Sequence, residues 1–377
     1  VDYPDGTSEF GYTLVTDAGR QNVVDFGRPL PGIDNGARAR VSGPVDARGH
    51  VAVDTIELLP PAPVATPPMA PATNVTPQAV TTGYTVIPLK YPNNAAAPFT
   101  YNADPASWPI ATINTTVLGA APALSTAEYY KEVSYGAQLV SGVVAHDANA
   151  WLKANEARPT ACSSSAQLDA VLASINTQGN AAAQAAGFNP SSRPGILYVI
   201  DALPCGWLGL GYIGWERAYA KGTASLLVVG HEFGHNFGLY HAGSLDCGAN
   251  VIAPSGCTVT EYGDPFDIMG NNRPMHFAAA QKSLLGYFSG SGVATHGSGS
   301  TTYTLGPIEL AGQSRYAVKI PTSNPKRTYW IEFRQPIGFD SALSGYPNLG
   351  AHLRISSPFE NNCSRCTGMY DDTQFLD

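Results

Sequence analysis

Apolar and polar residues alternate along much of the first 59 residues, most clearly over residues 50–59, HVAVDTIELL. This period of two places successive side chains on opposite faces of a β-strand. Residues 37–43 alternate in the same way, and the turn-forming residues 46–49 between the two segments favour a hairpin. We therefore predict a small β domain over residues 1–59, either a sandwich or a barrel of the five-stranded OB type.

A proline-rich segment follows at residues 60–77, PPAPVATPPMAPATNVTP. Such a segment is extended, cannot build a core and is open to proteases, so it predicts a linker. Residues 1–59 have few aromatic and basic residues, which favours a structural or inhibitory, propeptide-like role over nucleic-acid binding. Because no cysteine precedes Cys162, inhibition by this region would need an aspartate or steric cover rather than a thiolate.

From residue 78 to residue 292, apolar runs alternate with segments of helical periodicity. This pattern predicts a second, larger domain that contains both strands and helices. Strands are predicted at residues 84–89, 111–118, 138–145 and 193–200. Helices are predicted at residues 128–135, 163–186, 223–237 and 275–288. The first of these helices follows a capping box in which Ser125 is the N-cap and Glu128 the N3 residue.

Two further segments complete the predicted organisation. The glycines of residues 206–214 fit an edge strand that lines a cleft, where a substrate backbone could approach closely, although turns would explain them equally well. Beyond residue 292 the composition changes to glycine, serine and threonine, and strands are predicted at 302–305, 316–320 and 329–334. Residues 293–377 are therefore predicted to form a C-terminal all-β domain.

Composition narrows the partners of this chain. The 377 residues are too many for a single small core and favour two or three domains. The net charge is -8, and the 21 basic residues form no run, which argues against nucleic acid and anionic membranes as partners. No apolar segment is long enough to span a bilayer, so we expect no membrane insertion. We also expect the protein to be a monomer. Because the chain starts at Val1 without a methionine, we expect that an N-terminal segment has been removed or is not included in this sequence.

The six cysteines indicate disulfides and an oxidising compartment, because their number is even and no spacing fits a cysteine-bound zinc ion. We expect Cys247 to pair with Cys257 across a short loop. Cys363 and Cys366 could close a small local ring, which would leave Cys162 and Cys205 for each other. The sequence is also compatible with other pairings. Disulfides in any pairing indicate a secreted, extracellular protein.

The clearest chemical signal is the stretch HEFGHNFGLYH at residues 231–241. His231 and His235 are four residues apart, so on a helix both imidazoles lie on one face and can reach one metal ion. Gly238 allows the sharp turn that would bring His241 back as a third ligand. Three nitrogen ligands with one open position are typical of a single catalytic Zn²⁺ ion. No pattern supports an additional Ca²⁺ site.

Glu232 lies directly beside the first histidine and is placed to act as general base and acid on the water that zinc activates. The short motif HExxH also occurs by chance on surface helices. Here the motif is longer, and the apolar run at residues 224–229 would seat its helix in a core.

The whole string HExxHxxGxxH resembles the metzincin metalloproteases, a clan in which a methionine turn follows the zinc ligands. HEFGHNFGLYHA at 231–242 and EYGDPFDIMG at 261–270 are most similar to the gametolysin family of secreted peptidases. The block YWIEFRQ at 329–335 resembles the region after that family's catalytic domain. The resemblance implies an α+β, α/β-like fold with a twisted, mostly parallel sheet and helices, split by a cleft. It also implies a catalytic domain over residues 78–292.

The resemblance also implies a methionine beneath the zinc ion. We assign this role to Met269, because its surroundings match the closer family, rather than to Met275, which precedes His276 as in the turn of other clan members. We expect His276 at a helix start or in the cleft wall. Some relatives have a tyrosine just after this turn, but here Asn271 and Asn272 follow Gly270, so no oxyanion-stabilising residue is assigned.

These residues predict a secreted zinc metalloendopeptidase that cleaves peptide bonds of extracellular or cell-wall proteins. Its substrate would be a protein or peptide bound as an extended strand along residues 206–214. A zinc hydrolase of cell-wall polymers is one alternative. A catalytically silent adhesion or binding protein is another, although the presence of Glu232 argues against it.

Overall fold

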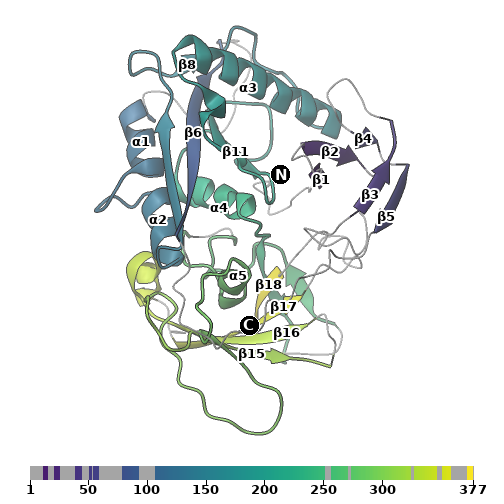
Figure 1. Cartoon of the computed structure of the whole chain (residues 1–377), viewed down its shortest axis with the longest axis vertical. Helices are drawn as coiled ribbons and strands as arrows, with labels where there is room; N and C mark the ends of the chain where they lie inside the picture. The colour runs from purple at the N-terminus through teal and green to yellow at the C-terminus, as the bar shows by residue number, and fades with distance from the viewer. Residues whose placement is uncertain are drawn as a thin grey trace, which may run out of the picture.

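The structure is a computed structural model, and it describes residues 12–15, 21–25, 39–44, 51–52, 54–58, 79–92, 107–250, 256–270, 273–323, 327–345, 350–357 and 372–376. Figure 1 shows three regions: short strands near the N-terminus, a helix-covered sheet, and a second sheet that contains the C-terminal strands.

The N-terminal strands form two separate ladders. β1, β2 and β4 make one sheet, and β3 pairs with β5 in antiparallel register. The bounds are Tyr12–Val15 for β1, Gln21–Asp25 for β2, Ala39–Ser42 for β3, Val51–Ala52 for β4 and Thr55–Leu58 for β5. The expected pairing of the two alternating segments is therefore confirmed. The turn at 46–49 and the linker at 60–77 lie outside the described residues, and the barrel and inhibitory roles stay predictions.

A six-stranded sheet forms the framework of the larger unit, in the order β10-β11-β9-β6-β7, with β8 paired to the end of β6. Its ladders are parallel except at the edge strand β10, which runs antiparallel to β11. The bounds are Val80–Lys90 for β6, Gln138–Val144 for β7, Leu152–Lys153 for β8, Gly195–Ile200 for β9, Gly209–Gly211 for β10 and Arg217–Lys221 for β11.

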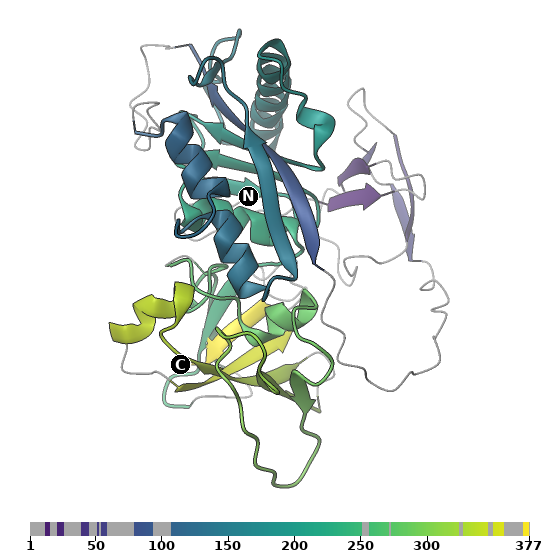
Figure 2. The same ribbon diagram turned by 60° about the vertical axis from the view of Figure 1, so that its left-hand side comes forward.

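Helices cover both faces of this sheet, as Figure 2 shows for the blue helices α1 and α2 and the teal helix α3. Strand β9 is apolar throughout because it is buried on both sides: Leu197 and Val199 belong to the core under α1, α2 and α4, whereas Ile196, Tyr198 and Ile200 belong to the core under α3. The bounds are Ile110–Leu118 for α1, Thr126–Val133 for α2, Ser165–Ala185 for α3, Leu226–Asn236 for α4 and Ala279–Leu284 for α5; two short 3₁₀ helices are η1 (Pro190–Ser192) and η2 (Gly338–Gly345).

The second sheet has seven strands in the order β13-β12-β18-β17-β16-β15-β14. The bounds are Ala242–Asp246 for β12, Thr258–Thr260 for β13, Val293–Thr295 for β14, Ala317–Pro321 for β15, Thr328–Arg334 for β16, Gly350–Ser357 for β17 and Asp372–Leu376 for β18. Strands β12 and β13 precede residue 292 but share this sheet, and β12 pairs in parallel with β18. The strands after residue 292 therefore do not form a sheet of their own, and the division into domains stays a prediction.

Several predicted elements differ from the structure. Residues 111–118 were expected to be a strand but lie in helix α1, because Ile110, Ile113 and Val117 share one buried helical face that outweighs the β-propensity of the segment. Residues 302–305 form no strand, and the predicted helix at 275–288 is shortened to α5. The N-cap is confirmed: the Ser125 hydroxyl accepts a hydrogen bond from the Glu128 backbone N–H at 3.1 Å.

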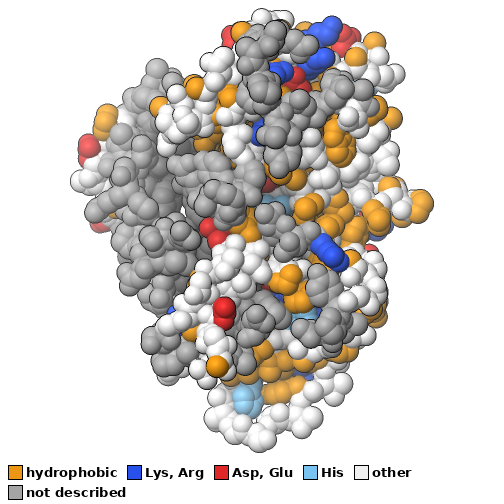
Figure 3. Space-filling view, turned by 180° about the vertical axis from the view of Figure 1, so that it is seen from behind, with side chains coloured by type: hydrophobic (Ala, Val, Ile, Leu, Met, Phe, Trp, Pro, Cys, Tyr) orange, Lys and Arg blue, Asp and Glu red, His pale blue; other side chains and the backbone are white. Residues whose placement is uncertain are grey.

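Two of the expected disulfides are confirmed, Cys162–Cys205 and Cys247–Cys257. The predicted pair Cys363 and Cys366 lies outside the described residues. None of the helices in the described ranges is long and apolar enough to cross a membrane. On the face shown in Figure 3, the Lys and Arg side chains of the described residues are few, and several of them lie at the top of the view beside acidic side chains.

Candidate metal centre

Helix α4 carries the first two histidines and is fixed on the central sheet by its apolar face. Leu226, Val229 and Phe233 are buried at helical spacing. The ring of Phe233 stacks on Tyr84 of β6, with centroids 3.9 Å apart and planes 13° apart. The Tyr84 hydroxyl donates to Asn236 Oδ1 at 3.1 Å, so the end of the helix is tied to the same strand. The helix that carries His231 and His235 is thereby attached to strand β6 of the central sheet.

The chain turns sharply after α4, as the sequence predicts. Gly238 adopts φ +103°, a left-handed conformation that glycine enters without strain. The Leu239 N–H donates to the Gly234 carbonyl at 3.0 Å, which closes the turn onto the helix. This turn returns the chain so that His241 faces the helix.

The three histidines converge. One nitrogen of each of His231, His235 and His241 lies within 4.8 Å of those of the other two, and all three side chains are buried. The Nε2 atoms of His235 and His241 are 3.2 Å apart. No other group of three or more His, Cys, Asp or Glu side chains in the described ranges has ligand atoms this close together.

The other ring nitrogen of each histidine meets an acceptor. Nδ1 lies 2.8 Å from the Ile268 carbonyl in His231, 2.8 Å from the Leu239 carbonyl in His235, and 2.8 Å from Glu261 Oε1 in His241. A carbonyl or carboxylate oxygen can only accept, so each Nδ1 carries the proton and each Nε2 presents its lone pair. Three such Nε2 atoms are the donor set that a transition-metal ion such as zinc requires.

Glu232 lies beside the histidines, is 2% exposed, and is covered by the edge strand β10. A side chain at Gly209 would meet the Glu232 carboxylate, and one at Gly211 would meet the Glu232 carbonyl and His235 Cβ. The glycines of the predicted cleft-edge strand therefore let its backbone lie directly on helix α4. From the sequence, these glycines were expected to let a substrate backbone approach β10. In the structure, the close contact that they allow is between β10 and helix α4.

Met269 lies on the opposite side of α4 from β10. A side chain at Gly234 would meet the Met269 sulfur, and one at Gly230 would lie 2.8 Å from Ile268 Cδ1. Glycine inside a helix costs about 1 kcal/mol relative to alanine, and here it allows this close approach. The Met269 carbonyl also accepts from the Ala242 N–H at 2.9 Å, which links this turn to the residue after the third histidine.

Buried charges hold the loop that carries Met269. The Asp267 carboxylate accepts from the Met269 N–H at 2.8 Å and from the Ala278 N–H at 2.6 Å. Burial raises the pKa of the Asp267 carboxyl, and these N–H groups and Arg334 oppose that rise. Arg334 donates to the Phe266 carbonyl at 2.8 Å, so β16 of the second sheet supports the loop beneath the metal-binding helix.

The rival residues Met275 and His276 lie outside the histidine cluster. Met275 packs with Phe266 and Leu343. His276 Nε2 is 2.9 Å from Glu132 Oε1, and its Nδ1 is 3.0 Å from Lys282 Nζ. Burial, reinforced by the charge of Lys282, lowers the pKa of His276 well below its usual value, so its ring is neutral.

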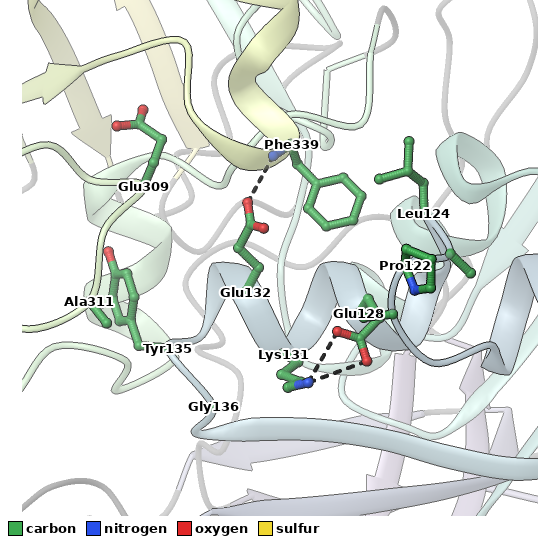
Figure 4. Close-up of a pocket in the computed structure, with 12 residues that line it drawn as sticks. Pro122, Leu124, Glu128, Lys131, Glu132, Tyr135, Gly136, Glu309, Ala311 and Phe339 are labelled. Carbon is green, nitrogen blue, oxygen red and sulfur yellow. Dashed lines mark hydrogen bonds and ion pairs between the residues drawn. The ribbon is translucent and has the colours of Figure 1, made fainter.

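A separate pocket of about 530 Å³ lies along α2 and the residues before it, and none of the three histidines lines it. Figure 4 shows Glu132 inside it, accepting a hydrogen bond from the Phe339 N–H at 2.8 Å, and Glu128 paired with Lys131. Glu309 also lines this pocket, and its side chain is 4% exposed. Burial raises the pKa of the Glu309 carboxyl to about 8, and Arg334 opposes that rise.

Two residues at the metal centre were not singled out from the sequence. Glu261 bonds the third histidine, and the ring of Tyr262 lies 3.9 Å from the ring of His241. Tyr262 is 6% exposed and has φ +58°, which is uncommon for a residue other than glycine. The only sequence signal was their place in the EYG segment shortly before Met269.

Two histidines and a glutamate on one helix, with a third buried histidine from the turn that follows, are an arrangement found in metal-dependent peptidases. The family model described as "Gametolysin peptidase M11" matches residues 100–344, more than half of the chain. The matched family is one of metalloendopeptidases. The chain belongs to this gametolysin M11 family of peptidases.

The other comparisons add little to this assignment. None of the curated proteins matches the chain. A solved structure titled "Structure of a chaperone-substrate complex" is 16% identical and has a TM-score of 0.25. The match covers 53% of this chain and 32% of that chain, so this protein spans about a third of its length. A likeness at this level carries no argument about fold or function.

Proposed function

We propose that this protein is a secreted zinc endopeptidase in which His231, His235 and His241 hold the ion and Glu232 is the general base and acid. The observation that carries the proposal is the convergence of three histidine nitrogens within 4.8 Å, with the buried Glu232 next to His231 on helix α4. The Nδ1 hydrogen bonds support it, because they direct all three Nε2 lone pairs toward one point.

A zinc ion held there would lower the pKa of its water ligand toward neutrality and polarise the scissile carbonyl. Glu232 accepts a proton from the attacking water and delivers it to the amine that leaves. Burial of this carboxylate under β10 excludes bulk water from the proton transfer. Met269 packs against α4 at Gly234 and forms the floor of the site without binding the ion.

The substrate class follows from the family and from the edge of the sheet. β10 is the last strand of the central sheet among the described residues, so an extended peptide could pair with its outer edge. We propose proteins of the extracellular matrix or cell wall as substrates, in keeping with the gametolysin family. The two disulfides support an extracellular location.

Removal of the metal tests this function. We expect a chelator to abolish hydrolysis of casein by the purified chain, and stoichiometric Zn²⁺ to restore it, because all catalytic steps need the ion. Peptidoglycan and glycoprotein substrates in the same assay distinguish an endopeptidase from the alternative, a hydrolase of cell-wall polymers. Casein hydrolysis that persists unchanged after complete removal of metal would rule out the proposal.

A further inference from the structure

The three histidines do not have equivalent partners. His231 and His235 donate from Nδ1 to neutral backbone carbonyls, whereas His241 donates to the carboxylate of Glu261 at 2.8 Å. A hydrogen bond to an ionised acceptor is stronger than one to a neutral acceptor, and it increases the basicity of the opposite ring nitrogen. His241 is therefore the strongest of the three donors toward a metal ion.

A short hairpin brings Glu261 to His241. Strand β12 begins at the residue after His241, and strand β13 ends at the residue before Glu261. The two strands are antiparallel, with Ser244 opposite Thr260. This register places the histidine and the carboxylate side by side at the open end of the hairpin. The Cys247–Cys257 disulfide closes its other end.

Tyr262 completes the contact with the third histidine. Its ring covers the His241 imidazole, with planes 33° apart, and it holds the left-handed backbone conformation noted above. A side chain at the following Gly263 would meet the Ser244 hydroxyl and the Thr260 carbonyl, so the turn is pressed onto the hairpin. The orientation of His241 is thus fixed through its Nδ1 and through one ring face, both from the same turn.

We propose that Glu261 is a positioning residue for the third metal ligand, and that the disulfide-linked strand pair β12–β13 determines how tightly the centre retains its ion. This inference rests on the proposed zinc site. Loss of such an outer partner typically weakens metal binding about 10–100-fold. Glutamine at position 261 could still accept the hydrogen bond from His241 but carries no charge. The Glu261→Gln variant therefore distinguishes the effect of orienting His241 from the effect of the negative charge.

The test measures the zinc dissociation constant of the full chain by competition with a chelator. We expect Glu261→Ala to bind zinc about 10–100-fold more weakly than the parent and Glu261→Gln to fall between them. Glu128→Gln is the matched control and should bind as the parent does, because Glu128 lines the separate pocket and not the histidine cluster. The visible absorption bands of the Co²⁺-substituted protein should shift in both Glu261 variants but not in the control. Binding within twofold of the parent in both Glu261 variants would overturn the inference.

A second pair of variants tests the hairpin without touching Glu261. The double replacement of Cys247 and Cys257 by serine should weaken zinc binding toward the value of Glu261→Ala. The same replacement of Cys162 and Cys205 should not, because that disulfide lies at α3, away from the hairpin. Equal zinc binding in both double variants would contradict the role of the hairpin. A parent chain that binds no zinc would refute the proposed function itself, whereas an active, zinc-binding parent with unaffected variants would refute only this inference.

Discussion

Replacement of Glu232 by glutamine is expected to remove nearly all peptidase activity while the protein keeps its zinc ion. Glutamine has the same shape and leaves the packing under β10 unchanged, but it cannot accept a proton from water. The three histidines are unaltered, so the metal should remain bound. We expect kcat/KM on a fluorogenic peptide to fall about 10²–10⁴-fold, the range typical of general base catalysis.

Zinc content and activity must be measured on the same preparation of this variant. Glu128→Gln serves as a matched control, because Glu128 lines a separate pocket and forms an ion pair with Lys131. The control should keep the activity of the parent. If Glu232→Gln retained more than a tenth of parental kcat/KM, Glu232 could not be the general base.

The second large effect is expected for Arg334→Met, which should lower the free energy of unfolding by about 3–5 kcal/mol. Arg334 is fully buried and pairs with Glu332 at 3.0 Å and Asp340 at 2.8 Å. It also donates to the backbone carbonyls of Phe266 and His276. Methionine fills similar space but leaves two buried carboxylates and two carbonyls without this donor.

Urea denaturation of the parent and the variant measures the effect. Lys131→Met is the control: Lys131 is about half exposed and pairs with Glu128 at 3.1 Å, so its loss should cost about 0–1 kcal/mol. A loss of stability for Arg334→Met no larger than that of the control would show that the second sheet does not hold the Met269 loop. The expected large loss would make residues after 292 part of the catalytic unit.

Strong local patterns made much of the fold predictable. The buried run at 195–200 and the apolar face of the helix beginning near Ser164 are read directly from periodicity. Gly238 was predicted to turn because no other residue adopts φ > 0 so readily, and it has φ +103°. The histidines of α4 share a face because helix geometry requires it at a spacing of four.

The sequence predictions fail where contacts between distant segments determine the local structure. Strand β11 was missed because Arg217 and Lys221 bound a run of only three residues, and its β character depends on pairing with β9. The parallel ladder between β12 and β18 joins segments more than a hundred residues apart and leaves no local pattern. For the same reason the sharing of one sheet across residue 292 could not be seen.

The same distinction between local patterns and distant contacts applies to the proposed metal centre. The ligand set is written in one contiguous stretch, so the sequence predicts it. The bond from His241 to Glu261 spans 20 residues and exists only because a hairpin folds between them. The support of the Met269 loop by Arg334 spans 68 residues. Such outer contacts need the register of the sheets before they can be assigned.

The zinc K-edge X-ray absorption spectrum of the zinc-loaded chain tests the central claim most directly, because it reports the atoms bound to the ion. We predict three imidazole nitrogens at about 2.0–2.1 Å with one further oxygen, and one imidazole fewer in His241→Ala. One zinc ion per chain should account for the whole signal. A spectrum with sulfur neighbours, or one unchanged by His241→Ala, would contradict the proposed site.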